Sequence, residues 1–273
     1  IVSPELPIEF INTGELDIKT TYVLPVTIKS VEGIGVLQSA KTYYYVFRGA
    51  SLINVVCNIS RNRAYPDFKN DSKFNNLTEN TMEILFKANS FPNTLNTLMG
   101  IESNYLLRIG DATIPNNQLQ VATSVNNCTS ADLQLESGKW YHVAVAFNKG
   151  NVKVYINGVE KLSGSTGKSS VSLGAKHTNE EDGSRCFWVG YSYKDDRYFD
   201  GVVSEVRIWN RALTAEEIQA TNHFYTIEPE SEGLIAYWKF DEGSGTVAKD
   251  YSVSGYDLTI EKEPKWESVS LPQ

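Results

Sequence analysis

Apolar and polar residues alternate in short runs along most of the chain, and clusters of Gly, Asn, Asp and Ser separate the runs. A period of two predicts strands with one buried face, whereas the helical period is nearly absent. The clearest runs are Tyr22–Ile28, Lys41–Phe47, Thr81–Phe86, Tyr141–Phe147, Asn151–Ile156, Phe187–Gly190 and Gly201–Trp209. This pattern predicts an all-β protein built as a sandwich.

Two turn signals and one helix signal add detail to the sandwich. Asn148–Gly150 joins two alternating runs, and Asn157-Gly158 supplies residues that tolerate positive φ in a tight hairpin. Thr214 followed by Glu217 has the spacing of a capping box. We therefore expect hairpins at both turns and one short helix over Thr214–Ala220.

The chain divides near residue 50. Residues 1–50 are predicted to be part of an N-terminal β-domain, and residues 51–273 to be the main domain. Fifty residues with three or four strands are too few for an independent sandwich, so this piece is either the tail of a larger domain or a lobe of the main one. Because the chain opens on what reads as mid-domain sequence, we expect a preceding segment outside the numbering.

The composition of the chain restricts the classes of binding partner to be expected. The chain has 273 residues, a formal net charge of −8 and a pI near 5.1, with scattered Lys and Arg. Nucleic acid and anionic membrane are therefore not expected partners. No run approaches the ~20 apolar residues of a transmembrane helix. Cys57, Cys128 and Cys186 are an odd number, which leaves either a Cys128–Cys186 bridge or three small buried thiols.

Two motifs carry a resemblance to a known family. Gly138–Phe147 followed by Val152–Gly158, and then Phe199–Ile218, resemble the laminin G-like branch of the concanavalin A-like jelly rolls. The resemblance covers the chain from about Ile59 to its end. It implies a concanavalin A-like jelly-roll β-sandwich with a small N-terminal sandwich-like segment.

The stretch from Gly233 to Ile260 resembles the segment that normally begins such a domain. The first and last strands of a jelly roll are neighbours in the sheet, so moving this segment to the end of the chain leaves its strands in the same place. We therefore expect Leu234–Phe240 to complete the sandwich.

The N-terminal residues carry a shorter resemblance. Leu6–Phe10, Leu24–Ile28 and Lys41–Tyr45 are similar to the end of a domain of unknown function in Bacteroidetes outer-surface proteins. In that group the domain often precedes a laminin G-like module in loci for glycan capture. The resemblance implies a secreted or cell-surface protein, with a lipoprotein anchor outside this chain and outer-membrane glycan-uptake proteins as partners.

Catalytic chemistry is not expected. Glycosidases on this scaffold carry Glu-x-Asp-x-x-Glu on one strand, and the nearest sequence, Glu180–Asp182, lacks the final Glu. Of the three histidines, His142 belongs to the family motif and is predicted to lie in the core. His177 and His223 have neither a Gly-x-Ser-x-Gly elbow nor the spacing of a zinc site.

Calcium is a further implication of the resemblance. Many relatives bind Ca²⁺ at the sandwich rim through oxygen ligands. The loop Asp250–Asp257 corresponds to the family's Asp-x-Ser-Gly-Asn-Gly loop, which makes Asp250 the matching carboxylate. Val253 and Ser254 stand where Gly and Asn are usual, and a plain Asp turn is the alternative.

Sugars are held by aromatic faces and by side chains that bond hydroxyls in pairs. One loop concentrates such groups, and the candidate glycan-binding residues are Tyr191, Tyr193, Asp195, Asp196, Arg197 and Tyr198. Asn104-Tyr105 with Arg108 is a second candidate, whereas Trp140, Trp188, Trp209 and Trp238 are predicted to lie in the core. The favoured function is non-catalytic glycan binding at a bacterial surface. The alternatives are a protein-adhesion or structural module and, third, a glycoside hydrolase.

Overall fold

The computed structural model describes residues 16, 20–33, 35, 38–48, 51–178 and 185–272. The chain forms two compact units, residues 1–53 with 270–273, and residues 54–269. No helix among the described residues is long and apolar enough to cross a membrane.

In the smaller unit, the described strands β1 (Thr21–Thr27) and β2 (Thr42–Arg48) form an antiparallel pair. Thr21 lies opposite Arg48, and Thr27 lies opposite Thr42, so the pairing runs over the full length of both strands. Both strands coincide closely with two of the predicted runs. The predicted segment Leu6–Phe10 lies outside the described residues.

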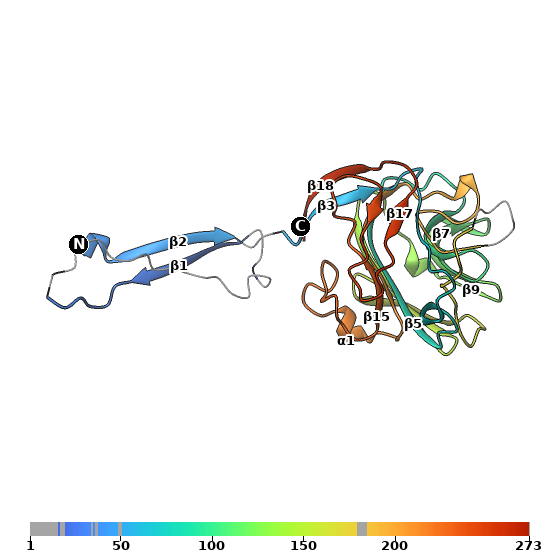
Figure 1. The fold of residues 1–273 in the computed structure, drawn as a ribbon, viewed down its shortest axis with the longest axis horizontal. Helices are drawn as coiled ribbons and strands as arrows, with labels where there is room; N and C mark the ends of the chain where they lie inside the picture. The colour runs from blue at the N-terminus through green and yellow to red at the C-terminus, as the bar shows by residue number, and fades with distance from the viewer. Residues whose placement is uncertain are drawn as a thin grey trace. The chain divides into compact units, whose positions relative to one another are not determined.

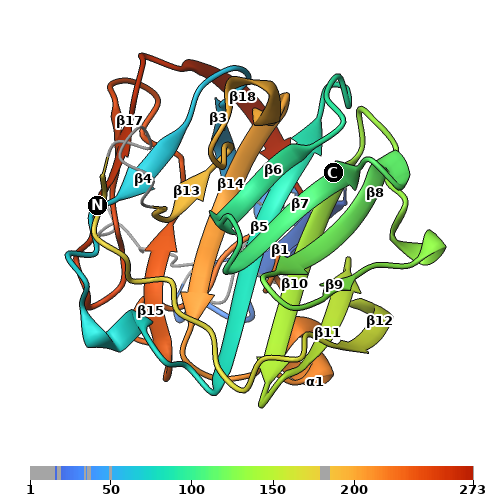
Figure 2. The same cartoon turned by 90° about the vertical axis from the view of Figure 1, so that its right-hand side faces the viewer.

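The larger unit consists of two antiparallel sheets (Figures 1 and 2). In order, the first sheet contains β12 (Val159–Ser165), β11 (Asn151–Ile156), β10 (Trp140–Asn148), β5 (Glu79–Ala88), β14 (Gly201–Trp209), β3 (Ile53–Asn58) and β18 (Lys265–Leu271), with β15 (Leu234–Trp238) also paired to β14. The second contains β16 (Val247–Ala248), β17 (Leu258–Ile260), β4 (Ala64–Pro66), β13 (Trp188–Val189), β6 (Asn96–Ile101), β7 (Tyr105–Asp111), β8 (Ile114–Thr123) and β9 (Asn127–Cys128). The all-β prediction is confirmed.

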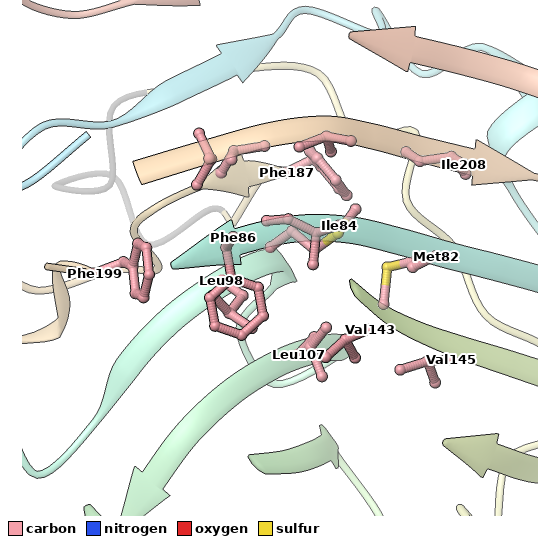
Figure 3. Packing of buried hydrophobic residues seen from close by; sticks show 14 of the residues in the cluster. Met82, Ile84, Phe86, Leu98, Leu107, Val143, Val145, Phe187, Phe199 and Ile208 are labelled. Atoms are coloured by element: carbon pink, nitrogen blue, oxygen red, sulfur yellow. The ribbon is translucent and has the colours of Figure 1, made fainter. Parts of the chain in front are cut away.

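The core lies between the sheets. Alternate residues of β5, which are Met82, Ile84 and Phe86, point inward and meet residues of β10 and of the second sheet, as Figure 3 shows. All three side chains are fully buried, and such burial is the main favourable term in folding, at ~25 cal/mol per Å² of apolar surface. The apolar residues that alternate in the sequence of β5 are thus the side chains that face this core.

The predicted turns and helix are confirmed. Asn148 pairs with Asn151 across the first turn, and Asn157 and Gly158 both have positive φ, 49° and 76°, in the second. The helix α1 (Ala215–Ile218) is capped by Thr214, whose hydroxyl accepts the Glu217 N–H while the Glu217 carboxylate accepts the Thr214 N–H. Buried Ile218 contributes to an apolar cluster with Trp209 and Tyr237, separate from the core between the sheets.

Strands from the last forty residues belong to both sheets. β15 pairs with β14 in the first sheet, and β17 pairs with β4 in the second. All five residues of β15 are buried, and Trp238 belongs to the core between the sheets. The last forty residues therefore supply interior parts of the sandwich.

A chain ending at residue 232 is expected to lose cooperative unfolding, because β14 and β4 would each lose a hydrogen-bonded neighbour and the core would lose Trp238. Urea unfolding followed by near-UV circular dichroism measures this. A chain ending at residue 264 keeps β15 and β17 and should retain a cooperative transition. If the shorter chain unfolded with an unchanged midpoint, the C-terminal strands would not be integral to the sandwich.

Candidate functional site

A pocket of about 730 Å³ opens at one end of the larger unit, among loops that follow β3, β5 and β17 and precede β14. We call it the rim pocket. Its lining residues are Ser60, Arg61, Ser90, Pro92, Asn93, Tyr198, Phe199, Asp200 and Lys262. Because four separate loops contribute, the sandwich fixes the position of each wall.

Asp200 organises the rim pocket. Its Oδ1 accepts a hydrogen bond from the Ser60 hydroxyl at 2.8 Å, and its Oδ2 accepts one from the Ser90 hydroxyl at 2.5 Å. Burial raises the pKa of Asp200, but these hydrogen bonds and a weaker one from Asn89 outweigh burial, so its pKa lies below the usual value. Asp200 is thus an ionised group whose two oxygens join two loops.

The loop before β14 supplies an aromatic wall. The Asn93 side-chain amide donates to the Tyr198 carbonyl at 3.0 Å, which joins this loop to the β5–β6 loop. The Tyr198 ring is half-buried and lies 4.8 Å from the Tyr191 ring, centroid to centroid. Exposed Pro92 adds a second apolar surface. The pocket therefore combines apolar faces with amide, hydroxyl and cationic groups.

The residues predicted for glycan binding lie in different surroundings in the structure. Tyr198 is the one described member of that set that lines the rim pocket. Tyr191 is only 2% exposed, because its ring packs against Trp188 and under the Arg63 guanidinium, 4.5 Å from the ring centroid. The Tyr191 ring is therefore not accessible as a stacking surface for a sugar, because Trp188, three residues earlier, and the sequence-distant Arg63 cover it.

Tyr193 has different surroundings. Its ring is half-buried and lies 4.3 Å from the Arg185 guanidinium and 4.9 Å from that of Arg197. Arg197 donates to Glu102 at 2.8 Å, so its charge is already paired. The Asp196 side chain is largely exposed, and the Asp195 side chain lies outside the described part of the structure.

The second candidate group does not form a surface site. Tyr105 is fully buried in the core, and Arg108 is bound by Gln120 at 2.8 Å and by Asp111 at 2.5 Å. Asn104 donates to the Ser172 carbonyl at 2.8 Å. The tryptophan prediction holds for the side chains of Trp188, Trp209 and Trp238, which are all buried, whereas Trp140 is half-buried.

A buried charged cluster that the sequence analysis missed lies away from this pocket. Ligand-type atoms of Glu83, His142 and His223 lie within 4.8 Å of one another. Glu83 Oε1 is 2.6 Å from His223 Nε2 and 3.4 Å from His142 Nε2. Only the motif histidine, His142, gave a signal in the sequence, and its predicted burial is confirmed.

Two imidazoles and a carboxylate are a set that zinc can use. Here, however, the Arg207 guanidinium lies 3.7 Å from Glu83 Oε2, and the Trp209 indole donates to the same oxygen at 2.7 Å. Burial alone would raise the pKa of Glu83. Its contacts with His142 and His223 have the opposite and larger effect, so the pKa lies well below the usual value. The arrangement is a hydrogen-bonded charge network that already contains its own cation.

Asp250 has the surroundings of a carboxylate that stabilises a loop. It is 4% exposed, and it accepts N–H groups of Tyr237 at 3.0 Å, Ser252 at 2.8 Å and Tyr256 at 2.8 Å. Burial raises the pKa of this carboxyl despite these bonds. Both oxygens of Asp250 thus accept backbone N–H groups of its own loop and of β15, as in the plain Asp turn, and calcium binding stays an untested expectation.

Of the two alternatives for the cysteines, a Cys128–Cys186 bridge or three buried thiols, the structure has the thiols. Cys57, Cys128 and Cys186 are all buried, and none of them forms a disulfide with another described cysteine. The Cys186 sulfur lies 3.3 Å from His177 Nδ1, and the His177 ring stacks on Tyr65 with 3.5 Å between centroids. The nearest acidic run to a glycosidase motif, Glu180–Asp182, lies outside the described residues.

Replacing Asp250 with Ala is expected to destabilise the protein by about 3 kcal/mol, since three N–H groups would lose their acceptor. Urea unfolding measures the loss, and exposed Asp132→Ala is the matched control with little effect. EDTA and Ca²⁺ should shift the melting temperature of both proteins equally. A calcium-dependent rise in the wild type that Asp250→Ala abolishes would make Asp250 a ligand.

Acid is expected to destabilise the protein in two steps. Burial lowers the pKa of His142 below its ordinary 6.5, so the unfolded chain binds this proton more readily and stability falls as pH drops below 6.5. The pKa of Glu83 is also lowered, so the protein loses further stability as the pH falls below the ordinary glutamate pKa of 4.5. Urea unfolding at pH 7.5, 6.0 and 5.0 should show the first step. His142→Gln should remove it, and an unchanged pH profile in that variant would contradict this assignment.

Comparison with curated proteins finds no match. Among solved structures, a candidate carbohydrate-binding protein from Bacteroides ovatus is similar, with 27% identity, a TM-score of 0.67, and coverage of 93% of this chain and 70% of that one. Domain 4 of an extracellular arabinanase from Geobacillus stearothermophilus, in complex with arabinotriose, has 20% identity, a TM-score of 0.47, and coverage of 79% and 91%. A heptameric pentraxin from Limulus polyphemus has 14% identity, a TM-score of 0.43, and coverage of 64% and 83%.

The family comparison agrees with the fold and with the two sequence motifs. The laminin G-type model, described as the concanavalin A-like lectin/glucanases superfamily, matches residues 62–219, which is more than half of the chain. The matched region includes β4 to β14 and α1, and so it contains most of both sheets. The chain therefore belongs to the concanavalin A-like lectin/glucanases superfamily.

Proposed function

We propose that the protein binds carbohydrate without catalysing a reaction on it, and that the rim pocket is its binding site. The observation that carries the proposal is the pocket itself, where four loops of the sandwich meet around Asp200. Its volume of about 730 Å³ falls within the range of small-ligand sites.

The lining chemistry suits a sugar. The Tyr198 ring and Pro92 offer apolar surfaces for the C–H faces of a pyranose, and Asn93 and the serine hydroxyls lie beside them. The Ser60 and Ser90 hydroxyls donate to Asp200, which fixes the direction of their protons. A preorganised polar floor of this kind lowers the cost of ordering the site on binding.

The charged groups support binding over hydrolysis. A glycosidase needs two carboxyl groups on either side of the scissile bond, and Asp200 is the one carboxylate among the described residues that line the pocket. Both of its oxygens are already hydrogen-bonded. Glu83 is fully buried within its charge network.

The superfamily contains lectins as well as glucanases, and the similar protein from Bacteroides ovatus is named as a candidate carbohydrate-binding protein. Together with the N-terminal resemblance to Bacteroidetes outer-surface proteins, these comparisons support a role at the bacterial cell surface. We propose that the protein, anchored as a lipoprotein, captures polysaccharide or host glycan and presents it to outer-membrane uptake proteins.

A second candidate function, adhesion to another protein, is favoured by the β1–β2 hairpin. Leu24, Tyr43 and Tyr45 share one face of this pair, where they are 39%, 65% and 41% exposed. Tyr44 and Val46, on the opposite face, are 67% and 66% exposed. Apolar residues exposed on both faces of a two-stranded sheet are typical of a surface that another chain or segment covers.

A glycan-array screen tests the carbohydrate proposal. The wild-type chain should bind a discrete glycan class, and the double variant Asn93→Ala/Tyr198→Leu should weaken binding about tenfold or more, because it removes an aromatic wall and an amide of the pocket. Titration calorimetry on the best glycan measures the loss. Circular dichroism verifies that the variant folds.

Tyr193→Ala is the matched control, since it removes an aromatic ring of the same loop that does not line the pocket. Binding that survives the double variant but is lost in Tyr193→Ala would move the site to the surroundings of Tyr193. If high micromolar protein bound no glycan at all, the carbohydrate proposal would be wrong and adhesion through the hairpin would take its place.

A further inference from the structure

The rim pocket contains two cations in a protein that is acidic as a whole. Arg61 and Lys262 both line the pocket and are both exposed, whereas the chain has a formal net charge of −8. Within the described part of the chain, no salt bridge involves either residue. Each cation does lie near a carboxylate, Arg61 near Asp200 and Lys262 near Glu261, where its charge helps to lower the pKa of that carboxyl.

A reciprocal pair of hydrogen bonds joins the two loops that carry these cations. Asn62, which is only 5% exposed, donates its side-chain amide to the Lys262 carbonyl at 2.7 Å. In return, the Lys262 N–H donates to the Asn62 side-chain oxygen at 3.2 Å. Asn62 directly follows Arg61, so this reciprocal pair joins the β3–β4 and β17–β18 loops, which carry the two cations.

The neighbouring carboxylates are already occupied. Arg63 binds Glu261 through two hydrogen bonds of 3.0 and 2.7 Å, which engages the carboxylate next to Lys262 in sequence. Asp200, the one carboxylate among the described lining residues, accepts the Ser60 and Ser90 hydroxyls and remains ionised. With the two cations Arg61 and Lys262 against the single carboxylate Asp200, the described lining of the pocket carries an excess of positive charge.

We propose that the rim pocket selects glycans that carry an anionic substituent, either the carboxylate of a uronic acid or a sulfate ester. This inference rests on the proposed carbohydrate-binding function and adds the class of sugar. Arg61 presents planar donors that match the oxygens of a carboxylate or sulfate in pairs, while Lys262 adds a second positive charge. Tyr198 and Pro92 would contact the sugar ring that carries the anion.

The test compares glycans that differ only in charge. Titration calorimetry of the full chain would use oligogalacturonate against its fully methyl-esterified form. It would also compare chondroitin sulfate, chondroitin and carboxyl-reduced chondroitin, which separates the contribution of sulfate from that of carboxylate. We expect at least one anionic member to bind about tenfold or more tightly than its neutral counterpart, with affinity falling between 50 and 300 mM NaCl as exposed charges are screened.

Two double variants test whether Arg61 and Lys262 cause the preference for anionic glycans. Arg61→Gln/Lys262→Gln should remove the preference for the anionic glycan and most of the salt dependence. The matched control is Lys149→Gln/Lys161→Gln, which makes the same change in net charge at exposed positions outside the pocket and should bind like the wild type. Circular dichroism and the melting temperature establish that both double variants fold.

The outcomes separate this inference from the function on which it rests. Equal or stronger binding of neutral glycans would overturn the charge selectivity and keep the carbohydrate function. An anionic preference that survives Arg61→Gln/Lys262→Gln, or that the control variant also loses, would overturn the assignment to this pocket. If no charged or neutral glycan bound, the proposed function itself would fail.

Discussion

The buried ion pair between Glu83 and Arg207 is the constraint on which the larger unit depends. Glu83 lies opposite Ala144 of β10 and opposite Arg207 of β14, so one carboxylate sits on the middle strand of three. His223, from the segment after α1, contacts the same carboxylate. A charge buried this deeply is tolerated only when its partners are in place, and removing one partner of such a pair costs roughly 3–5 kcal/mol.

The same network shapes β14, the strand that leads out of the rim pocket. The pairing of β14 with β5 shifts register between Ser204 and Arg207, and Glu205 has a positive φ of 49° there. The shift lets Arg207 bind Glu205, which also accepts the Tyr237 hydroxyl at 2.6 Å. β14 is thereby joined to β5 on one side and to β15 on the other, which gives Asp200, directly before β14, a rigid support.

The sequence predicted features that depend on local chemistry. The alternation along β5 and β10, the Asn157-Gly158 turn and the capping box at Thr214 each follow from neighbouring residues, and each is present. The motif histidine, His142, was expected in the core and is buried there.

The site was harder to predict, because its walls come from loops far apart in the chain. Ser60, Ser90 and Lys262 have no unusual sequence context, and only the fold brings them to one pocket. Tyr191 and Tyr198 belong to one Tyr-rich loop, yet one packs against Trp188 and the other lines the pocket. Composition identified the loop, whereas tertiary packing decided which of its side chains a ligand can reach.

The position of β15 and β17 near the end of the chain also constrains how the molecule is made. β15 and β17 pair with strands that are synthesised earlier, β14 and β4, so both sheets stay incomplete until residues near 260 have emerged. Domains generally fold as units, so the sandwich is not expected to form before these strands are available. A nascent chain of this design therefore exposes unpaired edges of β14 and β4 until β15 and β17 have been made.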